Sequence, residues 1–384
     1  MKLIFVSNFL NHYQKALAEE FIKFYGDGYK FIAMTPFDVQ RLNIGFKDEN
    51  QAPYVIRAYE SSEAMQEAMK LIDESECVIV GGVPVNVVAE RLKQGKITFM
   101  YSERFFKGPV MKDIVRFFKY CLYSGGRTQA RDIHSKFYLL CAGAFAAWDY
   151  NTCGLFRGKA YRWGYFPDIK HYDDIDGLIS RKKKHSILWA GRFLDWKHPD
   201  IAVMLAKNLK ASGLEFSMKI IGSGEMRDSL AGMIEAMNLR DCVELTDSLP
   251  TEELRKEMER TQIFLFTSDR GEGWGVVLNE AMNSGCTVAA SDRIGSVPYL
   301  VRDGYNGLIF RDRDIDGLTQ KVSDLLKDSE KTAELGREAY NTMCGVWNAQ
   351  EAAKRFVVLA DALSSSDEPV RLWEDGPCSI APVI

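Results

Sequence analysis

Two series of short apolar runs alternate with amphipathic stretches along this chain, and few folds accommodate such a pattern. The first series occupies residues 3–7, 29–34, 77–82, 97–101 and 137–141, and the second 186–191, 216–222, 242–245, 262–267, 286–291 and 307–310. Strands of parallel sheets read as continuous apolar runs because helices cover both faces of the sheet. The pattern therefore predicts two doubly wound α/β domains that face each other across a cleft.

A polar, charged stretch separates the two series. It is typical of an interdomain linker. We expect a first domain over 1–166, a linker over 167–185 and a second domain from 186 to 345. The end of the chain, after Leu363, is polar and contains proline, so we expect a mobile tail there.

Composition narrows the classes of protein. A net charge of −4 and a pI near 5.9 argue against a general nucleic-acid binder. The eight cysteines form no C-x-x-C pair and no zinc spacing, which is typical of free thiols in a reducing cytoplasm. The apolar runs are too short for a signal peptide or a membrane span. We expect a cytoplasmic protein that is at most peripheral to a membrane.

Candidate ligand-binding residues follow the strands of the second series, where doubly wound sheets bind ligands. Arg192 and Lys197 come after the first strand, and both cations could reach a diphosphate. A solvated basic loop is the alternative. The sequence Gly222-Ser223-Gly224-Glu225 follows the second strand, where glycines allow a ligand to approach the backbone. A plain tight turn would explain the same residues.

The stretch EGWGVVLNE, 272–280, follows the fourth strand of this series. Glu272 and Glu280 are carboxylates that could accept from hydroxyl groups. Between them, a helix beginning near Gly275 would present its first N–H groups to a ligand. Together these groups favour a ligand with hydroxyls and phosphate; a loop acid and a helix-surface acid are the alternative.

Residues 189–310 resemble the nucleotide-sugar-binding domain of retaining GT-B glycosyltransferases, family 4 type (glycosyl transferases group 1). The resemblance lies in the two glutamates with seven residues between them, in the glycines around Trp274, and in the later sequences GCTVAAS and DGYNGLIF. It implies two Rossmann-like domains and a nucleoside-diphosphate sugar as donor. It also implies a last helix, within 346–384, that crosses back to the first domain.

The resemblance also implies roles for these residues. Glu272 would hold the donor sugar, Glu280 the ribose, and Arg192 and Lys197 the diphosphate. The backbone at Gly273, Gly275, Val276 and Val277 would meet the sugar and the diphosphate. The sugar would move with retention of configuration and without a metal ion or another cofactor. The two DID sequences, 174–176 and 314–316, look like linker or helix-start acids rather than Mg²⁺ ligands.

The first domain departs from the family pattern. Its first loop, SNFLNHYQK, has no glycine, and the loop after its fourth strand reads YSERFFK. Asn11, His12, Ser102 and Glu103 are therefore interpreted as acceptor-side residues with open roles, and His12 is equally compatible with a helix cap or a surface position. The glycine pair 81–82 could approach a ligand or form a plain turn.

Residues 104–136 carry eight Lys or Arg against two Asp. Val110, Ile114, Phe117, Phe118 and Cys121 would share one face of a helix. A basic amphipathic helix could lie on an anionic membrane, where lipid-linked acceptors are found. A helix that faces the core with a solvated basic side is the alternative.

The function expected from the resemblance is sugar transfer to a glycan or lipid-linked acceptor in cell-surface polysaccharide or glycolipid synthesis. One alternative is a catalytically inactive nucleotide-sugar-binding or scaffold protein. Another is a different GT-B enzyme, such as a nucleotide-sugar epimerase or a glycogen-type phosphorylase or synthase. A dehydrogenase is disfavoured because neither domain has the full glycine fingerprint.

Overall fold

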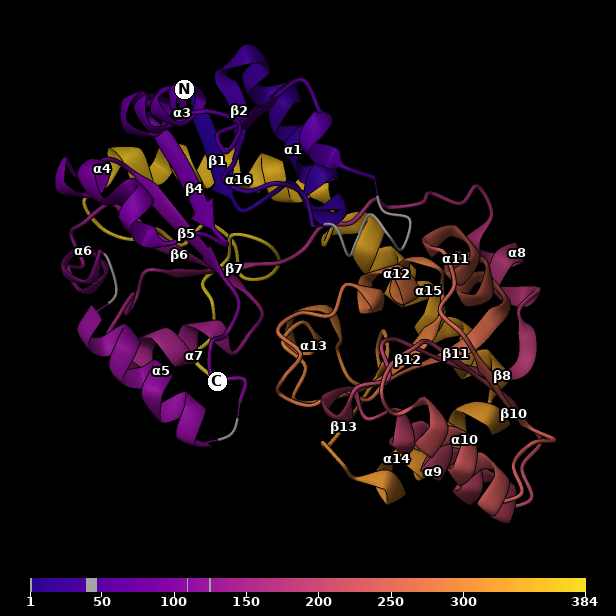
Figure 1. Cartoon of the computed structure of the whole chain (residues 1–384). Coiled ribbons are helices and arrows are strands. Elements are labelled where there is room, and N and C mark those ends of the chain that lie inside the picture. Colours follow the sequence, from indigo (N-terminus) through magenta and orange to yellow (C-terminus); the bar gives the residue numbers. More distant parts are fainter. Residues whose placement is uncertain (1, 39–46, 109, 124–125) are drawn as a thin grey trace. The chain divides into compact units, whose positions relative to one another are not determined.

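The computed structural model describes residues 2–38, 47–108, 110–123 and 126–384. The chain forms two compact units. Unit 1 comprises Met1–Asp168 and Val346–Ile384, and unit 2 comprises Ile169–Gly345. Figure 1 shows a sheet with helices on both faces in each unit, which confirms the predicted pair of parallel α/β domains.

Seven parallel strands form the sheet among the described residues of unit 1, in the order β3-β2-β1-β4-β5-β6-β7. The strands are β1 Leu3–Ser7, β2 Tyr29–Ala33, β3 Val55–Arg57, β4 Cys77–Gly81, β5 Thr98–Ser102, β6 Phe137–Ala142 and β7 Ala160–Trp163. The α-helices are α1 His12–Tyr25, α3 Ser62–Glu74, α4 Ala89–Lys93, α5 Val110–Tyr123, α6 Arg127–Arg131, α7 Ala146–Thr152 and α16 Ala349–Ser365. The two edge strands, β3 and β7, are additional to the five runs that the sequence indicates.

Unit 2 has six parallel strands in the order β10-β9-β8-β11-β12-β13. They are β8 Lys183–Ala190, β9 Ser217–Ile221, β10 Val243–Thr246, β11 Thr261–Phe266, β12 Thr287–Ser291 and β13 Leu308–Phe310. The helices are α8 Ile175–Ser180, α9 Pro199–Ala211, α10 Arg227–Ala236, α11 Thr251–Arg260, α12 Val277–Asn283, α13 Val297–Leu300, α14 Ile315–Lys327 and α15 Ser329–Gly345. Helices α9, α10 and α14 lie on one face of the sheet, and α11, α12 and α15 on the other (Figure 1).

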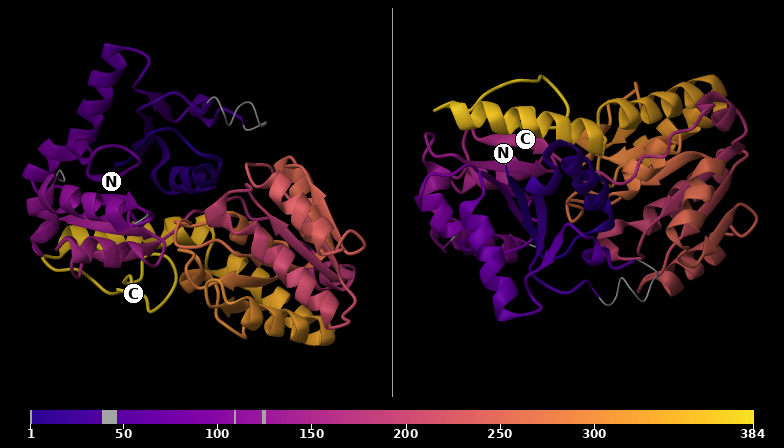
Figure 2. Two further views of the ribbon diagram at one scale, coloured as in Figure 1. Left: turned by 60° about the horizontal axis from the view of Figure 1, so that its bottom comes forward. Right: turned by 90° about the horizontal axis from the view of Figure 1, so that it is seen from above.

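Helix α16 lies in unit 1, where it packs along α1 (Figure 2). Its Phe356 is fully buried, and the ring centroid lies 5.4 Å from that of Phe21, 4.9 Å from that of Phe99 and 5.8 Å from that of Trp163. Burial of such a ring among three others contributes several kcal/mol in typical cores. The last helix is thus part of the core of unit 1.

The tail after α16 packs against unit 1, contrary to the expectation of a mobile end. The N–H of Arg162 in β7 donates to the carbonyl of Ser379 at 2.7 Å, and the N–H of Cys378 donates back to Arg162 at 2.8 Å. Because β7 is an edge strand, these bonds satisfy backbone groups that would otherwise be open to another chain.

Residues 169–185, expected as a linker, lie within unit 2. The backbone N–H of Lys170 donates to Asn283 at 2.9 Å, and the buried ammonium of Lys182 donates to the carbonyl of Met258 at 2.8 Å. Helix α8 falls in the middle of this segment. The polar sequence of the segment thus belongs to a packed surface layer.

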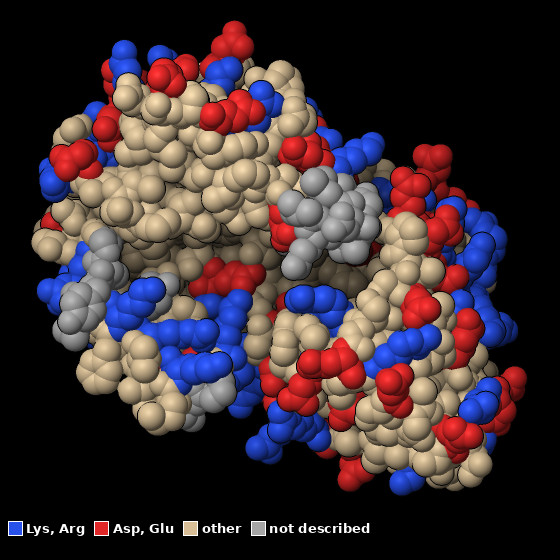
Figure 3. All heavy atoms as spheres, in the orientation of Figure 1, with Lys and Arg blue, Asp and Glu red and all other residues tan. Residues whose placement is uncertain are grey.

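The basic segment 104–136 forms α5 and α6 in unit 1, and its residues 109 and 124–125 lie outside the described part of the chain. Figure 3 shows Lys and Arg side chains gathered on the region of unit 1 where α5 and α7 are drawn in Figure 1. Among the described residues, no helix has the length and the apolar character needed to cross a membrane.

Candidate functional site

Two loops that follow β8 and β11 in unit 2 are tied together by one hydroxyl group. Trp189 donates its indole N–H to Thr267 Oγ1 at 2.8 Å. The same hydroxyl lies 2.8 Å from the carbonyl oxygen of Lys197 and 2.9 Å from that of His198. Thr267 is fully buried, so this network fixes the backbone of residue 197 beside the loop that contains residue 272.

Lys197 and Glu272 form an ion pair within this arrangement. Their side chains are only 13% and 11% exposed, and the Lys197 ammonium lies 4.7 Å from the centroid of the Trp196 ring. Ser268 donates a further hydrogen bond to Glu272 Oε2 at 3.4 Å. Two charges withdrawn from water in this way are stable only as a pair, because each would otherwise lose its solvation without compensation.

Gly275 sets the path of the chain between Glu272 and α12. It has φ +84°, and a Cβ at this position would lie 2.2 Å from the Phe266 ring. Glycine is therefore required both by the backbone conformation and by the space. Next to it, Trp274 is buried and donates to Asn279 at 2.9 Å, so the aromatic residue anchors the loop in the core. Helix α12 begins at Val277, directly after Val276, and is seven residues long.

Glu280 lies on α12 and is half-buried. Burial raises the pKa of its carboxyl group, and the charge of Arg255 opposes this shift. A carboxylate in such surroundings gains from any hydroxyl or N–H donor that approaches it.

The glycines after β9 have a packing role. A Cβ on Gly222 would lie 1.9 Å from the carbonyl oxygen of Gly191, and one on Gly224 would lie 2.5 Å from that of Phe193. The backbone of Phe193 donates to Ser223 at 2.8 Å, which closes this contact between loops. Close packing of two loops thus accounts for both glycines. Arg192, Ser223 and Glu225 are exposed.

His198 is a residue that the sequence analysis did not single out. It adopts φ +49°, and its buried ring lies 3.7 Å from Asp200 and 3.4 Å from Asp269, with Arg313 also 3.4 Å away. The two carboxylates raise the pKa of His198 to about 9. Asp269 belongs to the same loop as Glu272, and His198 directly follows Lys197. The contact between the His198 ring and Asp269 therefore connects the loop of Glu272 to the segment of Lys197. No motif marks His198, because its partners come from distant segments.

We expect the stability of unit 2 to fall between pH 7 and pH 10 through His198. The pKa of His198 is higher in the folded state than in the unfolded chain. Its contribution to stability is therefore fully present below about pH 6.5 and is lost as the pH rises through about 9. The loss is up to about 3 kcal/mol. The comparison is with His198→Asn, because Asn tolerates positive φ. Thermal unfolding of the wild type and of the variant at several pH values measures the loss of stability. If both proteins lose equal stability between pH 7 and pH 10, His198 does not cause the loss.

In unit 1, the acceptor-side candidates make local contacts. Asn11 precedes α1, and its backbone N–H donates to Gln14 Oε1 at 3.3 Å, which is a helix-capping contact. His12 is the first residue of α1, and its ring packs against Tyr13. Asn11 thus has a structural role at the start of α1.

Ser102 and Glu103 follow β5 in the same unit. Ser102 accepts from the hydroxyl of Tyr150 at 2.9 Å, and Glu103 contacts Tyr165 and Lys107. Gly81, at the end of β4, is the register partner of Tyr101 in β5. Ser102 and Glu103 with these partners form polar contacts at the carboxyl end of β5.

Asp149 of α7 holds the loop after β5, and sequence patterns did not indicate it. Its fully buried carboxylate accepts from the N–H groups of Phe105 and Phe106 at 2.8 and 2.9 Å and lies 3.3 Å from Arg104. Burial raises the pKa of Asp149, while the Arg104 charge opposes the rise. One feature of the sequence could have indicated Asp149: it is a lone acidic residue directly after the apolar stretch from Phe137 to Trp148.

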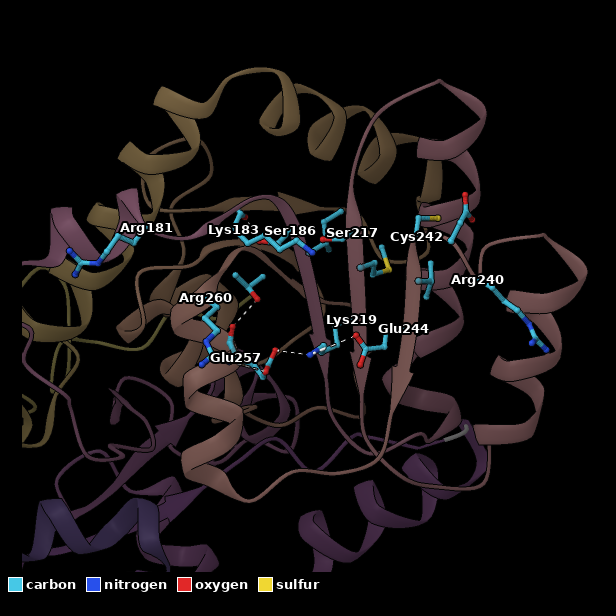
Figure 4. A pocket seen from close by; sticks show the side chains of 15 residues that line it. Arg181, Lys183, Ser186, Ser217, Lys219, Arg240, Cys242, Glu244, Glu257 and Arg260 are labelled. Atoms are coloured by element: carbon cyan, nitrogen blue, oxygen red, sulfur yellow. Dashed lines mark hydrogen bonds and ion pairs between the residues drawn. The ribbon is translucent and has the colours of Figure 1, made fainter.

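A pocket of about 600 Å³ lies at the other ends of the strands of unit 2. It is lined by the first residues of four strands, Lys183, Ser217, Val243 and Thr261, and by side chains of α11. Figure 4 shows the Lys219 ammonium between two carboxylates, those of Glu257 at 3.0 Å and Glu244 at 3.8 Å. This pocket contains none of the site residues that the sequence indicates. Among the described residues, no group of three or more His, Cys, Asp or Glu side chains could hold a metal ion.

Comparisons with known proteins indicate a family for part of the chain and a fold for the whole of it. Residues 173–342 match the family described as Glycosyl transferases group 1. Over 169 residues, the chain is 28% identical to an uncharacterized glycosyltransferase of Methanocaldococcus jannaschii, covering 44% of this chain and 43% of that protein. Over 188 residues, it is 27% identical to the GDP-mannose-dependent alpha-(1-6)-phosphatidylinositol monomannoside mannosyltransferase of Mycolicibacterium smegmatis, covering 47% and 48%. The chain thus spans less than half the length of these curated relatives.

The fold is similar to that of Anabaena HepE, whose crystal structure is a complex with UDP. The TM-score is 0.68 at 14% identity, and the match covers 94% of this chain and 100% of HepE. The family match falls on unit 2, and the structural match extends over both units. Residues 173–342, within unit 2, therefore match the Glycosyl transferases group 1 family, and the chain as a whole has the GT-B fold.

Proposed function

We propose that this protein transfers a sugar from a nucleoside-diphosphate sugar to an acceptor hydroxyl group in polysaccharide or glycolipid synthesis. The observation that carries the proposal is the buried Lys197–Glu272 pair, which joins two loops at the carboxyl ends of β8 and β11. Ligands of doubly wound sheets bind at such strand ends. The names of the relatives support it, since one is a GDP-mannose-dependent mannosyltransferase and HepE is described with UDP.

In this proposal each charged residue has a separate task. Glu272 accepts from hydroxyl groups of the donor sugar, and Glu280 accepts from the ribose, whose hydroxyls would compensate its half-buried carboxylate. Lys197, held near Glu272 before the donor binds, is then shared between that carboxylate and the diphosphate. The exposed Arg192 can reach the same diphosphate as a planar fork.

The reaction would proceed with retention and without a metal ion. Negative charge gathers on the diphosphate as it leaves, and Arg192 and Lys197 would stabilise it. Helix α12 adds little to this because seven residues give a weak dipole. The exposed Ser223 and Glu225, with the backbone at Gly222 and Gly224, would border the donor. In unit 1, Ser102, Glu103 and His12 are proposed to contact the acceptor.

We also propose that the acceptor is reached at the inner face of an anionic membrane. The basic segment 104–136, with eight Lys or Arg against two Asp, supports this location because such segments are attracted to anionic lipid.

The test is an NMR assay of sugar transfer with UDP-, GDP- and ADP-sugars, with a sugar acceptor and with EDTA present. The proposal predicts transfer from at least one donor, a product with the donor's anomeric configuration, and full rate in EDTA. Donor binding without transfer to any acceptor would indicate a scaffold protein. Conversion of the donor without an acceptor would indicate an epimerase. Loss of activity in EDTA that a metal ion restores would contradict metal independence.

A further inference from the structure

Helix α5 is fixed to unit 1 by one of its faces. Phe117 and Cys121, one turn apart, pack against the hydrophobic core of this unit. On the same helix, Arg116 donates to the carbonyl of Phe105 at 3.0 Å and to Asp113 at 3.2 Å. The orientation of the helix about its own axis is therefore set by side-chain contacts.

A second apolar face of α5 points to solvent. Met111 is 73% exposed, Val115 66% and Phe118 54%. These positions are four and three residues apart, so they form one stripe along the helix. Ile114, 43% exposed, lies at the border of the stripe. Large apolar side chains that are exposed as a group, rather than singly, mark a contact surface.

This stripe differs from the face that the sequence analysis indicated. Phe117 and Cys121 belong to the core, whereas Ile114 and Phe118 are exposed. The side chain of Val110 lies outside the described part of the chain. Core packing and an outward apolar stripe are thus both present on α5, so the two alternatives given by the sequence do not exclude each other.

Cations lie on one side of the stripe. Lys112 and Lys119 follow Met111 and Phe118 directly in the sequence, and both are exposed. Figure 3 shows the gathering of Lys and Arg in this region of unit 1. An apolar stripe flanked by lysines matches the interface of an anionic bilayer, where acyl chains lie below negative headgroups.

We propose that Met111, Val115 and Phe118, with Lys112 and Lys119, form the surface by which this protein rests on anionic lipid. The proposal rests on the membrane location proposed above and assigns it to one face of one helix. A second copy of the chain is a poorer occupant, because an antiparallel two-fold contact over the stripe would bring the lysines of both copies to the same side. The helix has 14 residues and lies on a bilayer rather than spanning one.

Vesicle co-sedimentation of the full chain tests this surface. With phosphatidylcholine vesicles containing about 40% phosphatidylglycerol, the wild type should bind, and the double variant Val115→Ser/Phe118→Ser should bind at least about tenfold more weakly. The matched control is Phe24→Ser/Val358→Ser, because these residues are 48% and 47% exposed on α1 and α16. This control should bind as the wild type does.

The charge contribution is tested with Lys112→Gln/Lys119→Gln. We expect about fivefold weaker binding per lysine removed on anionic vesicles, and little binding of any variant to pure phosphatidylcholine. Lys70→Gln/Lys354→Gln serves as the control, since both lysines are exposed on other helices.

Three results would overturn the proposal. They are equal binding of the Val115/Phe118 variant and its control, equal binding of neutral and anionic vesicles, and a wild-type dimer in light scattering that the Val115/Phe118 variant abolishes. Transfer to a soluble acceptor separates this surface from the proposed function. The stripe variants should keep the wild-type rate, and a wild type that binds vesicles but transfers nothing would refute only the function.

Discussion

Replacing Glu272 with Ala lowers the rate of sugar transfer by about 100-fold or more, if the proposed function holds. One preorganised polar contact to the reacting part of a substrate is worth about 3 kcal/mol. The change also leaves the Lys197 ammonium, 13% exposed, without its carboxylate partner. Glu272→Gln keeps the volume and a hydrogen-bond acceptor, and should lower the rate by a smaller factor. Initial rates with the best donor measure both.

A control variant separates this effect from general damage to unit 2. Glu259→Gln changes a glutamate that is 17% exposed and pairs with Lys170 at 2.6 Å, on α11 and outside the two loops. Its transfer rate should stay within about twofold of the wild type, because Glu259 lies outside the two loops and Gln keeps an acceptor oxygen for its donors Lys170 and Tyr172. If Glu272→Ala also stays within twofold while thermal unfolding is unchanged, Glu272 has no role in transfer.

Replacing Phe356 with Ala destabilises unit 1 by about 3–5 kcal/mol, the usual cost of a Phe→Ala change in a core. The ring is fully buried among Phe21, Phe99 and Trp163, so its removal leaves a cavity that rigid aromatic neighbours fill poorly. Urea unfolding measures the change. Val358→Ala, at a position 47% exposed on the same helix, should change stability by less than about 0.5 kcal/mol.

The two variants together test whether α16 belongs to the core of unit 1. A loss of less than about 1 kcal/mol for Phe356→Ala would mean that α16 adds little to this core. If Phe356→Ala and Val358→Ala lower the free energy of unfolding equally, the effect does not depend on the core contacts of Phe356.

The sequence was sufficient for the sheets because buried parallel strands are marked by their own apolar residues. It was not sufficient for β3 and β7, which have three and four residues at the edges of the sheet and carry no continuous apolar run. The polar, proline-containing composition of the tail after α16 predicts a mobile segment. What orders it is backbone pairing with β7, which side-chain composition does not report.

The sequence indicates candidate site residues where a motif marks them. It does not indicate which other residues they contact. Glu272 and Lys197 are 75 positions apart, so only the folded chain shows that they pair. His198 and Asp149 were missed because each acts through partners from distant segments. For α5, the sequence pattern puts Phe117, Phe118 and Cys121 on one face and leaves open whether that face meets the core. In the structure Phe117 and Cys121 meet the core while Phe118 is exposed, because the helix has two apolar faces that periodicity alone does not separate.

Calorimetric titration with UDP, GDP and ADP and with the matching nucleosides tests the central claim, that the loops around Lys197 and Glu272 bind a nucleoside diphosphate. At least one diphosphate should bind the wild type. Lys197→Ala should weaken that diphosphate by about tenfold or more, the size of a lost charge-assisted hydrogen bond, and should leave the nucleoside within about twofold. Lys256→Ala, an exposed lysine on α11, should change neither. The claim is contradicted if no diphosphate binds, or if Lys197→Ala weakens the diphosphate and the nucleoside equally.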